Sequence, residues 1–350
     1  MTERLTLALD AMGGDHAPAM VVRGAEIART RYPQVDFIFF GRESEISPLL
    51  DRMKKLKAVS RIVHTDEAVS SDDRPSVALR NRRSSSMRMA LDSVKEGAAK
   101  ATISAGNTGA LMAMAKFVLK TLPGVDRPAI ASFFPTLRGE TVMLDLGANV
   151  QCDARNLVQF TVMGNAFARS VLGIKEPTYG LLNVGSEELK GHEILHEARQ
   201  ELSGLNLPGR FHGFVEGDDI TKGTVDVVVT DGFTGNVALK TAEGTAKLYT
   251  EFLRGTFRSS LLASIGYLLA RPAMRKLLKR VDPRRYNGAV FLGLNGITVK
   301  SHGGTDALGF AHAIGVAVDL ARNGCLETMG RDFKAVDRST PDEPAQAAAV

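Results

Sequence analysis

The segment LTLALDAMGGDHAP, residues 5–18, joins a short apolar run to a turn rich in glycine and polar side chains. Residues 5–9 predict a buried β-strand, because the run is short, apolar and followed at once by turn residues. Gly13 and Gly14 can supply backbone angles closed to other residues, and Asp10 can cap the turn. Glycine also lets a ligand approach the backbone, so the segment fits either a simple turn or the wall of a binding site.

Short apolar runs alternate with helix-periodic segments along most of the chain. This alternation predicts a three-layer α/β/α sandwich with a largely parallel sheet. The expected strands are 5–9, 37–40, 102–104, 130–134, 142–146, 179–184, 211–215, 225–229 and 297–300. The expected helices include 110–119, 157–171, 192–202, 237–252 and 307–323.

Polar, glycine-containing stretches follow six of the expected strands: 10–16, 104–109, 145–149, 183–187, 216–219 and 231–236. Ligands of parallel α/β sheets bind beyond the carboxyl ends of the strands, so we expect these stretches to form one shared site at equivalent strand ends. Two of them place a G-x-x-G pattern before an apolar-periodic helix, in SAGNTGALMAMAK and TDGFTGNVALKTAEG. The free N–H groups of such a helix start favour an anion such as phosphate. The usual dinucleotide and P-loop signatures are missing.

Composition is that of a globular protein without a membrane span. Apolar residues make up 44% and charged residues 24% of the chain, and the formal net charge is +5. No apolar run reaches the roughly 20 residues that a span needs, and the N-terminus runs into a strand without signal-peptide architecture. The two cysteines, Cys152 and Cys325, fit a reducing compartment. We expect a cytoplasmic protein with one α/β domain over 1–333 and a disordered tail over 334–350.

In segment 255–290 almost all of the charged residues are basic, and apolar residues lie on one helical face. Pro272 interrupts the pattern, which predicts a helical hairpin. A basic amphipathic helix is typical of contact with an anionic membrane or an acidic partner, but a core-facing helix with a solvated charged side fits equally well. The residues expected to meet membrane or carrier are Leu268, Leu269, Arg275, Lys276, Leu277, Leu278, Lys279 and Arg280.

Residues 192–196, HEILH, match the H-E-x-x-H signature of helical zinc proteases. Two imidazoles four residues apart share a helix face, and Glu193 could activate water. A catalytic zinc needs a third protein ligand, however, and no metzincin-type extension follows. We interpret His192 and His196 as surface residues and expect no metal.

Seven stretches, taken in order, resemble the PlsX family, the phosphate acyltransferases of bacterial phospholipid synthesis. They are LALDAMGGDHAP, SAGNTGALMA, DLGANVQCDA, NVGSEELKG, FVEGDDI, VVTDGFTGNVALK and NGITVKSHG, and they cover the chain to about residue 325. The resemblance implies transfer of a long-chain fatty acyl group from acyl-carrier protein to inorganic phosphate, without a cofactor. The acyl-phosphate product would feed a membrane-bound glycerol-3-phosphate acyltransferase. The resemblance also implies a homodimer and a fold similar to the isocitrate and isopropylmalate dehydrogenases and the phosphotransacetylases.

The implied reaction needs fixed positive charge and hydrogen-bond donors beside a thioester, because phosphate is itself the nucleophile. We expect Lys190 to supply the cation, His16 to assist the departing thiolate or orient phosphate, and Asn236 to donate from its amide. Asp10 and Asp231 are expected to hold loops, because a carboxylate repels phosphate. The other expected substrate-binding residues are Gly13, Gly14, Gly106, Asn107, Thr108, Gly109, Asn149, Asn183, Gly185, Gly232, Gly235 and His302.

Three other functions stay open at this point. One is a phosphotransacetylase that uses coenzyme A, the second a metal- and NAD-dependent decarboxylating dehydrogenase of similar fold, and the third a non-catalytic membrane-associated scaffold. The basic segment favours an acidic carrier or a lipid surface over coenzyme A. Where the family commonly shows Lys-Gly-Asn-Glu, this chain has Lys-Gly-His-Glu at 190–193, which supports an accidental HEILH. The expected partners are therefore acyl-carrier protein, phosphate, a second copy and, peripherally, an anionic membrane, with no nucleic acid.

Overall fold

The computed structural model describes residues 4–280 and 282–339. Eleven strands form one sheet: β1 (Leu5–Asp10), β2 (Val35–Gly41), β3 (Ser60–His64), β4 (Ala101–Ser104), β5 (Ala129–Pro135), β6 (Glu140–Leu144), β7 (Thr178–Leu182), β8 (Arg210–Val215), β9 (Val227–Val229), β10 (Ala289–Leu292) and β11 (Ile297–Lys300). Their order across the sheet is β3-β2-β1-β4-β11-β10-β5-β6-β9-β7-β8. The nine expected strands are all present, whereas β3 and β10 were not expected.

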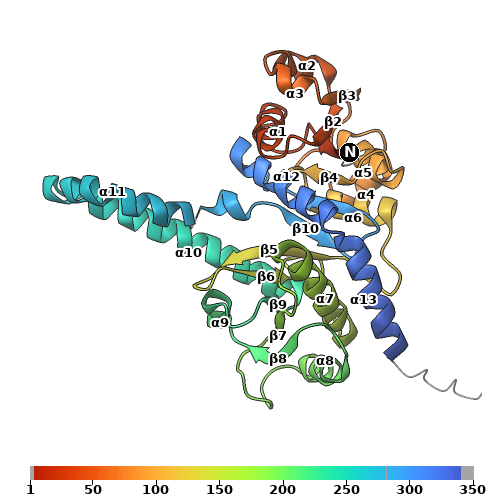
Figure 1. The fold of residues 1–350 in the computed structure, drawn as a ribbon, viewed down its shortest axis with the longest axis vertical. Helices are drawn as coiled ribbons and strands as arrows, with labels where there is room; N and C mark the ends of the chain where they lie inside the picture. Colours follow the sequence, from red (N-terminus) through yellow and green to blue (C-terminus); the bar gives the residue numbers. More distant parts are fainter. Residues whose placement is uncertain (1–3, 281, 340–350) are drawn as a thin grey trace, which may run out of the picture.

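Helices cover both faces of this sheet (Figure 1), which confirms the three-layer fold. They are α1 (Ala19–Arg31), α2 (Glu43–Asp51), α3 (Lys54–Lys57), α4 (Pro75–Asn81), α5 (Ser86–Lys95), α6 (Thr108–Leu119), α7 (Ala154–Phe167), α8 (Glu193–Gly204), α9 (Gly217–Lys222), α10 (Gly232–Arg258), α11 (Leu261–Arg280), α12 (Ala307–Arg322) and α13 (Cys325–Ser339). Strand side chains alternate between the two layers. Val142 and Leu144 of β6 join one hydrophobic cluster with α1, α7 and α12, and Met143 between them joins a second with α6.

The sheet reverses direction at its centre. Strands β1, β2, β3, β4 and β11 are parallel to one another, and so are β6, β7, β8 and β9. Between the two groups lie three antiparallel pairings, β11 with β10, β10 with β5 and β5 with β6. Three reversals set the two groups of strands in opposite directions. The carboxyl ends of one group therefore lie at one edge of the sheet and those of the other group at the opposite edge. The expectation of six stretches at equivalent strand ends is therefore wrong, and they form two groups.

Helices α10 and α11 form a hairpin that projects from the body of the molecule (Figure 1). The predicted hairpin is confirmed, but its turn lies at Ser259 and Ser260, and Pro272 lies inside α11. Ser260 accepts a hydrogen bond from the backbone N of Ala263, at 3.1 Å, and so caps the start of α11. None of the helices in the described ranges is long and apolar enough to cross a membrane. At the other end of the chain α13 continues to Ser339, past the expected end of the domain, and the rest of the expected tail lies outside the described residues.

Candidate active site

The turn after β1 packs directly against the turns after β4 and β11. A Cβ atom on Gly13 would lie 2.5 Å from Asp10 Oδ2 and 2.7 Å from the backbone N of Gly106. Gly14 has a φ of +102°, and a Cβ there would lie 3.1 Å from the carbonyl oxygen of Gly303. These two glycines therefore allow the three turns to pack closely, because a side chain at either position would clash with a neighbouring turn.

Asp10 is the buried centre of this cluster. Its Oδ1 accepts a hydrogen bond from the Ser86 hydroxyl and its Oδ2 one from the Ser104 hydroxyl, each at 2.6 Å. Burial raises the pKa of Asp10, and these hydrogen bonds oppose the shift. Asp10 thus ties the start of α5 to the end of β4, as expected for a residue that holds loops.

Lys300, at the end of β11, is the cation of this cluster. Its side chain is buried, and Nζ lies 3.4 Å from the carbonyl oxygen of Ala105 and donates to that of Ser301. Burial lowers the pKa of Lys300 to about 8, and the carboxylates of Asp10 and Asp15 oppose the shift. Sequence reasoning missed this residue, although it lies within the NGITVKSHG stretch.

Lys240 adds positive charge to the field at Lys300. It lies in the third turn of α10, and its charge contributes, after burial, to the lowered pKa of Lys300. Lys240 is exposed and forms an ion pair with Glu243, at 2.8 Å. Positive charge at this turn favours an anion there.

His302 follows Lys300 in the same turn. Its Nδ1 accepts a hydrogen bond from the backbone N of Gly304, at 3.2 Å, and its own backbone N donates to Asn287 Oδ1, at 2.8 Å. The neutral ring therefore carries its proton on Nε2. His16 is exposed in the turn before α1. We call Asp10, Gly13, Gly14, Gly106, Lys300 and His302 the lysine site.

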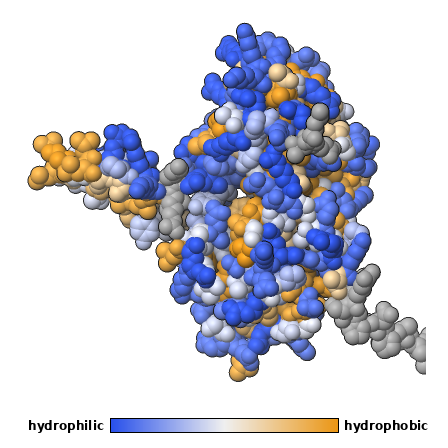
Figure 2. Space-filling view, viewed as in Figure 1, coloured by the Kyte–Doolittle hydropathy of each residue, from blue (hydrophilic) through white to orange (hydrophobic). Residues whose placement is uncertain are grey.

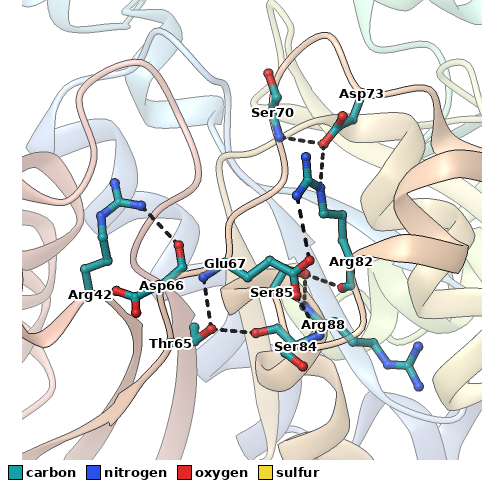
Figure 3. Close-up of polar contacts among 10 residues, drawn as sticks. All are labelled: Arg42, Thr65, Asp66, Glu67, Ser70, Asp73, Arg82, Ser84, Ser85 and Arg88. Carbon is teal, nitrogen blue, oxygen red and sulfur yellow. Dashed lines mark hydrogen bonds and ion pairs between the residues drawn. The ribbon is translucent and has the colours of Figure 1, made fainter.

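A loop over residues 65–85 borders this site, and Figure 3 shows its polar network. Glu67 Oε2 accepts from the backbone N of Ser84, at 3.0 Å, and Arg82 donates to Asp73 Oδ2, at 3.3 Å. The Asn107 amide donates to the carbonyl oxygens of Ser71 and Asp73, at 2.8 and 3.1 Å. We expected the Asn107 amide to donate hydrogen bonds to a ligand. In the structure it donates them to this loop and holds the loop in place.

The start of α6 lies beside the lysine site. Asn107 caps the helix by accepting from the backbone N of Ala110, at 3.0 Å. Thr108 and Gly109 follow it at the exposed first turn, whose N–H groups have no partner within the helix. A Cβ on Gly109 would lie 2.7 Å from Pro75 at the start of α4, so α4 and α6 approach each other closely here.

The second group of stretches is built around Asp145, after β6. Its carboxylate accepts hydrogen bonds from the backbone N of Ile130, Gly147, Ala148 and Asn149, at 2.7–3.2 Å, and from the Asn149 amide, at 2.9 Å. The Asn149 amide also donates to the Pro128 carbonyl oxygen, at 2.8 Å. Burial raises the pKa of Asp145, and the hydrogen bonds oppose the shift. These groups satisfy one another.

The start of α10 packs on this second group. Gly232 donates from its backbone N to the Asn149 carbonyl oxygen, at 2.7 Å, and a Cβ on Gly235 would clash with the carbonyl oxygen of Asp145. Asp231 caps the helix by accepting from the backbone N of Thr234, at 2.9 Å. The G-x-x-G pattern therefore fits the helix to a loop here. Of the expected site residues in this turn, Asn236 is the one with an exposed side chain.

Lys190 lies in the turn after β7, within the second group. Its side chain is 53% exposed and forms an ion pair with Glu187, at 2.7 Å, which raises the pKa of Lys190. The Asn183 amide donates to the Lys190 carbonyl oxygen, at 2.8 Å, and a Cβ on Gly185 would touch the Lys190 side chain. Lys190, Asn183 and Gly185 therefore lie together, at the same end of the sheet as the Asp145 group, because β6, β9 and β7 are parallel.

Three residues whose side chains could support other chemistry have ordinary surroundings. Burial raises the pKa of Cys152 to about 12, so its reactive thiolate is scarce at neutral pH. His192 is the N-cap of α8, and the His196 ring packs edge-on against Phe214, with centroids 5.7 Å apart. Within the described ranges, no three His, Cys, Asp or Glu side chains are arranged to hold a metal ion.

The apolar residues of the hairpin are exposed. Leu268 and Leu269 are 63% and 80% exposed, and Leu277 is 46% exposed. Arg275 and Lys276 are exposed as well, near the body-proximal end of α11. The side chains of Leu278, Lys279 and Arg280 lie outside the described part of the structure.

This fold is shared with phosphotransacetylases. A phosphotransacetylase from Streptococcus pyogenes superposes with a TM-score of 0.63 at 17% identity, over 92% of this chain and 95% of its own. A 4-hydroxythreonine-4-phosphate dehydrogenase from Salmonella typhimurium gives a TM-score of 0.52 at 14% identity, over 91% and 100%. At these identities the likeness is one of fold, and it defines the class as an α/β protein with the fold that phosphotransacetylases have.

Sequence comparison gives the family within this class. The family model described as "Fatty acid synthesis protein" matches residues 5–328. A phosphate acyltransferase of Rhodospirillum centenum is 68% identical over 329 residues, which cover 94% of this chain and 93% of the relative. One from Paramagnetospirillum magneticum is 58% identical over 351 residues, covering 100% and 99%. The chain therefore belongs to the PlsX family of phosphate acyltransferases and is an acyltransferase, which confirms the resemblance.

Proposed function

We propose that this enzyme transfers a long-chain fatty acyl group from acyl-carrier protein to inorganic phosphate, forming an acyl-phosphate and the free carrier thiol. The observation that carries the proposal is the buried ammonium group of Lys300 at a glycine-lined turn, to whose field Lys240 adds positive charge. Phosphate at this turn gains a partner of opposite charge. The acceptor named here also agrees with the name of the PlsX relatives, phosphate acyltransferase.

In the proposed mechanism, a phosphate oxygen attacks the carbonyl carbon of the thioester. Lys300 and Lys240 hold the phosphate, and the free N–H groups of Thr108 and Gly109 at the start of α6 stabilise the tetrahedral oxyanion. The carbon–sulfur bond then breaks, and the departing thiolate takes the proton that the attacking hydrogen phosphate carried, while His302 Nε2–H donates a hydrogen bond to the sulfur. No Ser or Cys intermediate is needed, because phosphate is already a competent nucleophile.

The release of carrier thiol tests this reaction. We expect a thiol reagent to detect phosphate-dependent release from palmitoyl-carrier protein, much faster than from acetyl-coenzyme A at saturating phosphate. Faster turnover of acetyl-coenzyme A would support a phosphotransacetylase instead. No thiol release with either donor would support a non-catalytic scaffold, and a change of absorbance at 340 nm with a hydroxy acid and NAD would support a dehydrogenase.

The hairpin tip is proposed to contact an anionic membrane peripherally. Figure 2 shows hydrophobic side chains gathered at the far end of the hairpin, where Leu261 and Leu262 are 81% and 82% exposed and Ile265 is 51% exposed. Leu277 lies roughly 24 Å further along α11, closer to the body, from the rise of 1.5 Å per residue. The contact therefore centres on 261–269, and the basic residues after 270 would meet headgroups or carrier. Release of a labile acyl-phosphate there would serve a membrane acyltransferase.

Flotation with anionic vesicles tests this contact. Leu261→Glu with Leu262→Glu should abolish flotation, because charge at the tip opposes insertion. Leu277→Glu is the matched control and should float. Loss of flotation in the control alone would place the contact at the base of the hairpin.

A homodimer is proposed as well. Leu248, Tyr249 and Phe252 of α10 are 51%, 63% and 61% exposed, which offers an apolar face to a second copy. Sedimentation equilibrium should show a dimer that Phe252→Glu weakens. A wild-type protein that stays monomeric at all concentrations tested would contradict the dimer.

A further inference from the structure

A groove lies between α4 and α6, on the outer surface of the layer that covers the lysine site. It has a volume of about 470 Å³, and we call it the α4–α6 groove. Phe117, which lines the groove near the C-terminal end of α6, is 52% exposed and offers its ring to a partner. The lining residues are Leu79, Ala113, Lys116, Phe117, Lys120 and Thr121.

Positive charge surrounds this groove. Lys120 Nζ lies 4.8 Å from the centre of the Phe117 ring, and the Arg88 guanidinium lies 5.4 Å from it. Arg88 also pairs with Asp92, at 3.0 Å, and Figure 3 shows its guanidinium pointing away from the polar network of the 65–85 loop. Lys116 and Lys120 form no ion pair with any carboxylate in the described ranges, so their charge is available to a partner.

The groove lies along the helix that begins at the candidate active site. Helices α4 and α6 approach each other closely at Pro75 and Gly109, and α6 begins beside Gly106. Phe117 lies nine residues along α6 from Thr108, which is roughly 14 Å at 1.5 Å per residue. A macromolecule seated in the groove can therefore extend a flexible arm along α6 to the lysine site.

We propose that the α4–α6 groove is the docking surface for the acidic carrier protein, with Phe117 as the apolar anchor and Lys116 and Lys120 as the charged rim. The inference rests on the proposed function and adds where the donor binds. Unpaired lysines favour an acidic partner over a second copy of this basic chain, and an exposed aromatic ring favours an apolar side chain of that partner. An acyl chain alone would gain nothing from the lysine rim.

Charge reversal with a matched control tests the docking surface. Lys116→Glu with Lys120→Glu should raise the KM for palmitoyl-carrier protein by roughly 5- to 10-fold and weaken its dependence on salt. The KM for phosphate and the turnover of palmitoyl-coenzyme A should stay unchanged, because neither phosphate nor a coenzyme A thioester contains the carrier protein that binds the groove. Lys175→Glu, an exposed lysine outside the groove, should leave all of these unchanged.

Each result has one meaning. An unchanged KM for the carrier in the double variant overturns the docking surface while leaving the proposed reaction intact. If the double variant lost as much activity with palmitoyl-coenzyme A as with the carrier, the groove would bind the acyl chain or maintain the fold. That result also overturns the proposal. A wild-type enzyme that releases no carrier thiol contradicts the proposed function itself. Phe117→Ala, which keeps the charges, should raise the KM for the carrier alone.

Discussion

The turns around Asp10 and those around Asp145 have the same appearance in the sequence but different chemistry. Both carboxylates follow a strand, both are buried among glycines, and burial raises the pKa of each. Asp10 is held by two serine hydroxyls and faces the ammonium group of Lys300. Asp145 is surrounded by backbone N–H groups of its own turn and has no cation beside it.

The comparison shows that a buried carboxylate after a strand does not by itself mark a binding site. What distinguishes the lysine site is an incompletely neutralised positive charge next to a glycine-lined space. The Asp145 group uses all its donors and acceptors internally, so we assign it to stability. Each prediction below separates the two regions.

The largest effect is expected from Lys300→Met, which removes the charge and keeps the length of the side chain. Loss of one preorganised charged donor costs about 100- to 1000-fold in rate. We expect that loss in carrier-thiol release, with a circular dichroism spectrum and melting like those of the wild type. A loss below threefold in a folded protein would remove Lys300 from the site.

Asp145→Ala should act on stability and not on chemistry. It leaves several buried N–H groups without an acceptor, at a cost of about 3 kcal/mol or more in the free energy of unfolding. Urea unfolding measures this cost, and Asp231→Ala, which removes a helix cap, should cost only about 1 kcal/mol. A stable Asp145→Ala variant that has lost transfer activity would place the Asp145 group in the site.

The pH dependence should follow Lys300. Its pKa is lowered to about 8, so the ammonium form dominates below pH 8 and is lost as the pH rises through that value. We expect kcat/KM for phosphate to fall about tenfold per pH unit above pH 8. The ratio of wild type to Lys300→Met removes the titration of phosphate itself. A ratio that stays flat between pH 7 and pH 10 contradicts a role for the charged lysine.

The smallest effect is expected from Lys190→Ala. The side chain is exposed and paired with Glu187, so its removal should lower the transfer rate by less than tenfold. The same assay with a Glu187→Gln control reports whether the ion pair itself matters. A loss as large as that of Lys300→Met would place Lys190 at the phosphate, as the sequence led us to expect.

The sequence predicted the fold better than it predicted the site. Apolar runs identified nine strands, but β10 is only four residues long between Gly288 and Gly293, with no alternation to mark it. Because β10 is one of the strands at which the direction changes, its omission made all strand ends seem equivalent. Motif stretches therefore gave the family correctly, but the expectation that all six lie at equivalent strand ends was wrong.

Lys300 was missed for a physical reason. A lysine at the end of a short apolar strand resembles any exposed residue that terminates a strand, and burial is not visible in the sequence. Lys240 was missed because the sequence does not show that its charge acts on Lys300, 60 residues further along the chain. The hairpin was predicted from Pro272, but α11 accommodates that proline within its length. The turn of the hairpin lies at Ser259 and Ser260, where α10 ends and α11 begins.

Binding of inorganic phosphate to the free enzyme tests the central claim, that the lysine site and not the Asp145 group holds the acceptor. Isothermal titration calorimetry of the wild type should show one phosphate site per chain. Lys300→Met should weaken that site at least tenfold, and Lys190→Ala should leave it unchanged. Phosphate binding of wild-type affinity in Lys300→Met, or its loss in Lys190→Ala alone, would contradict the account.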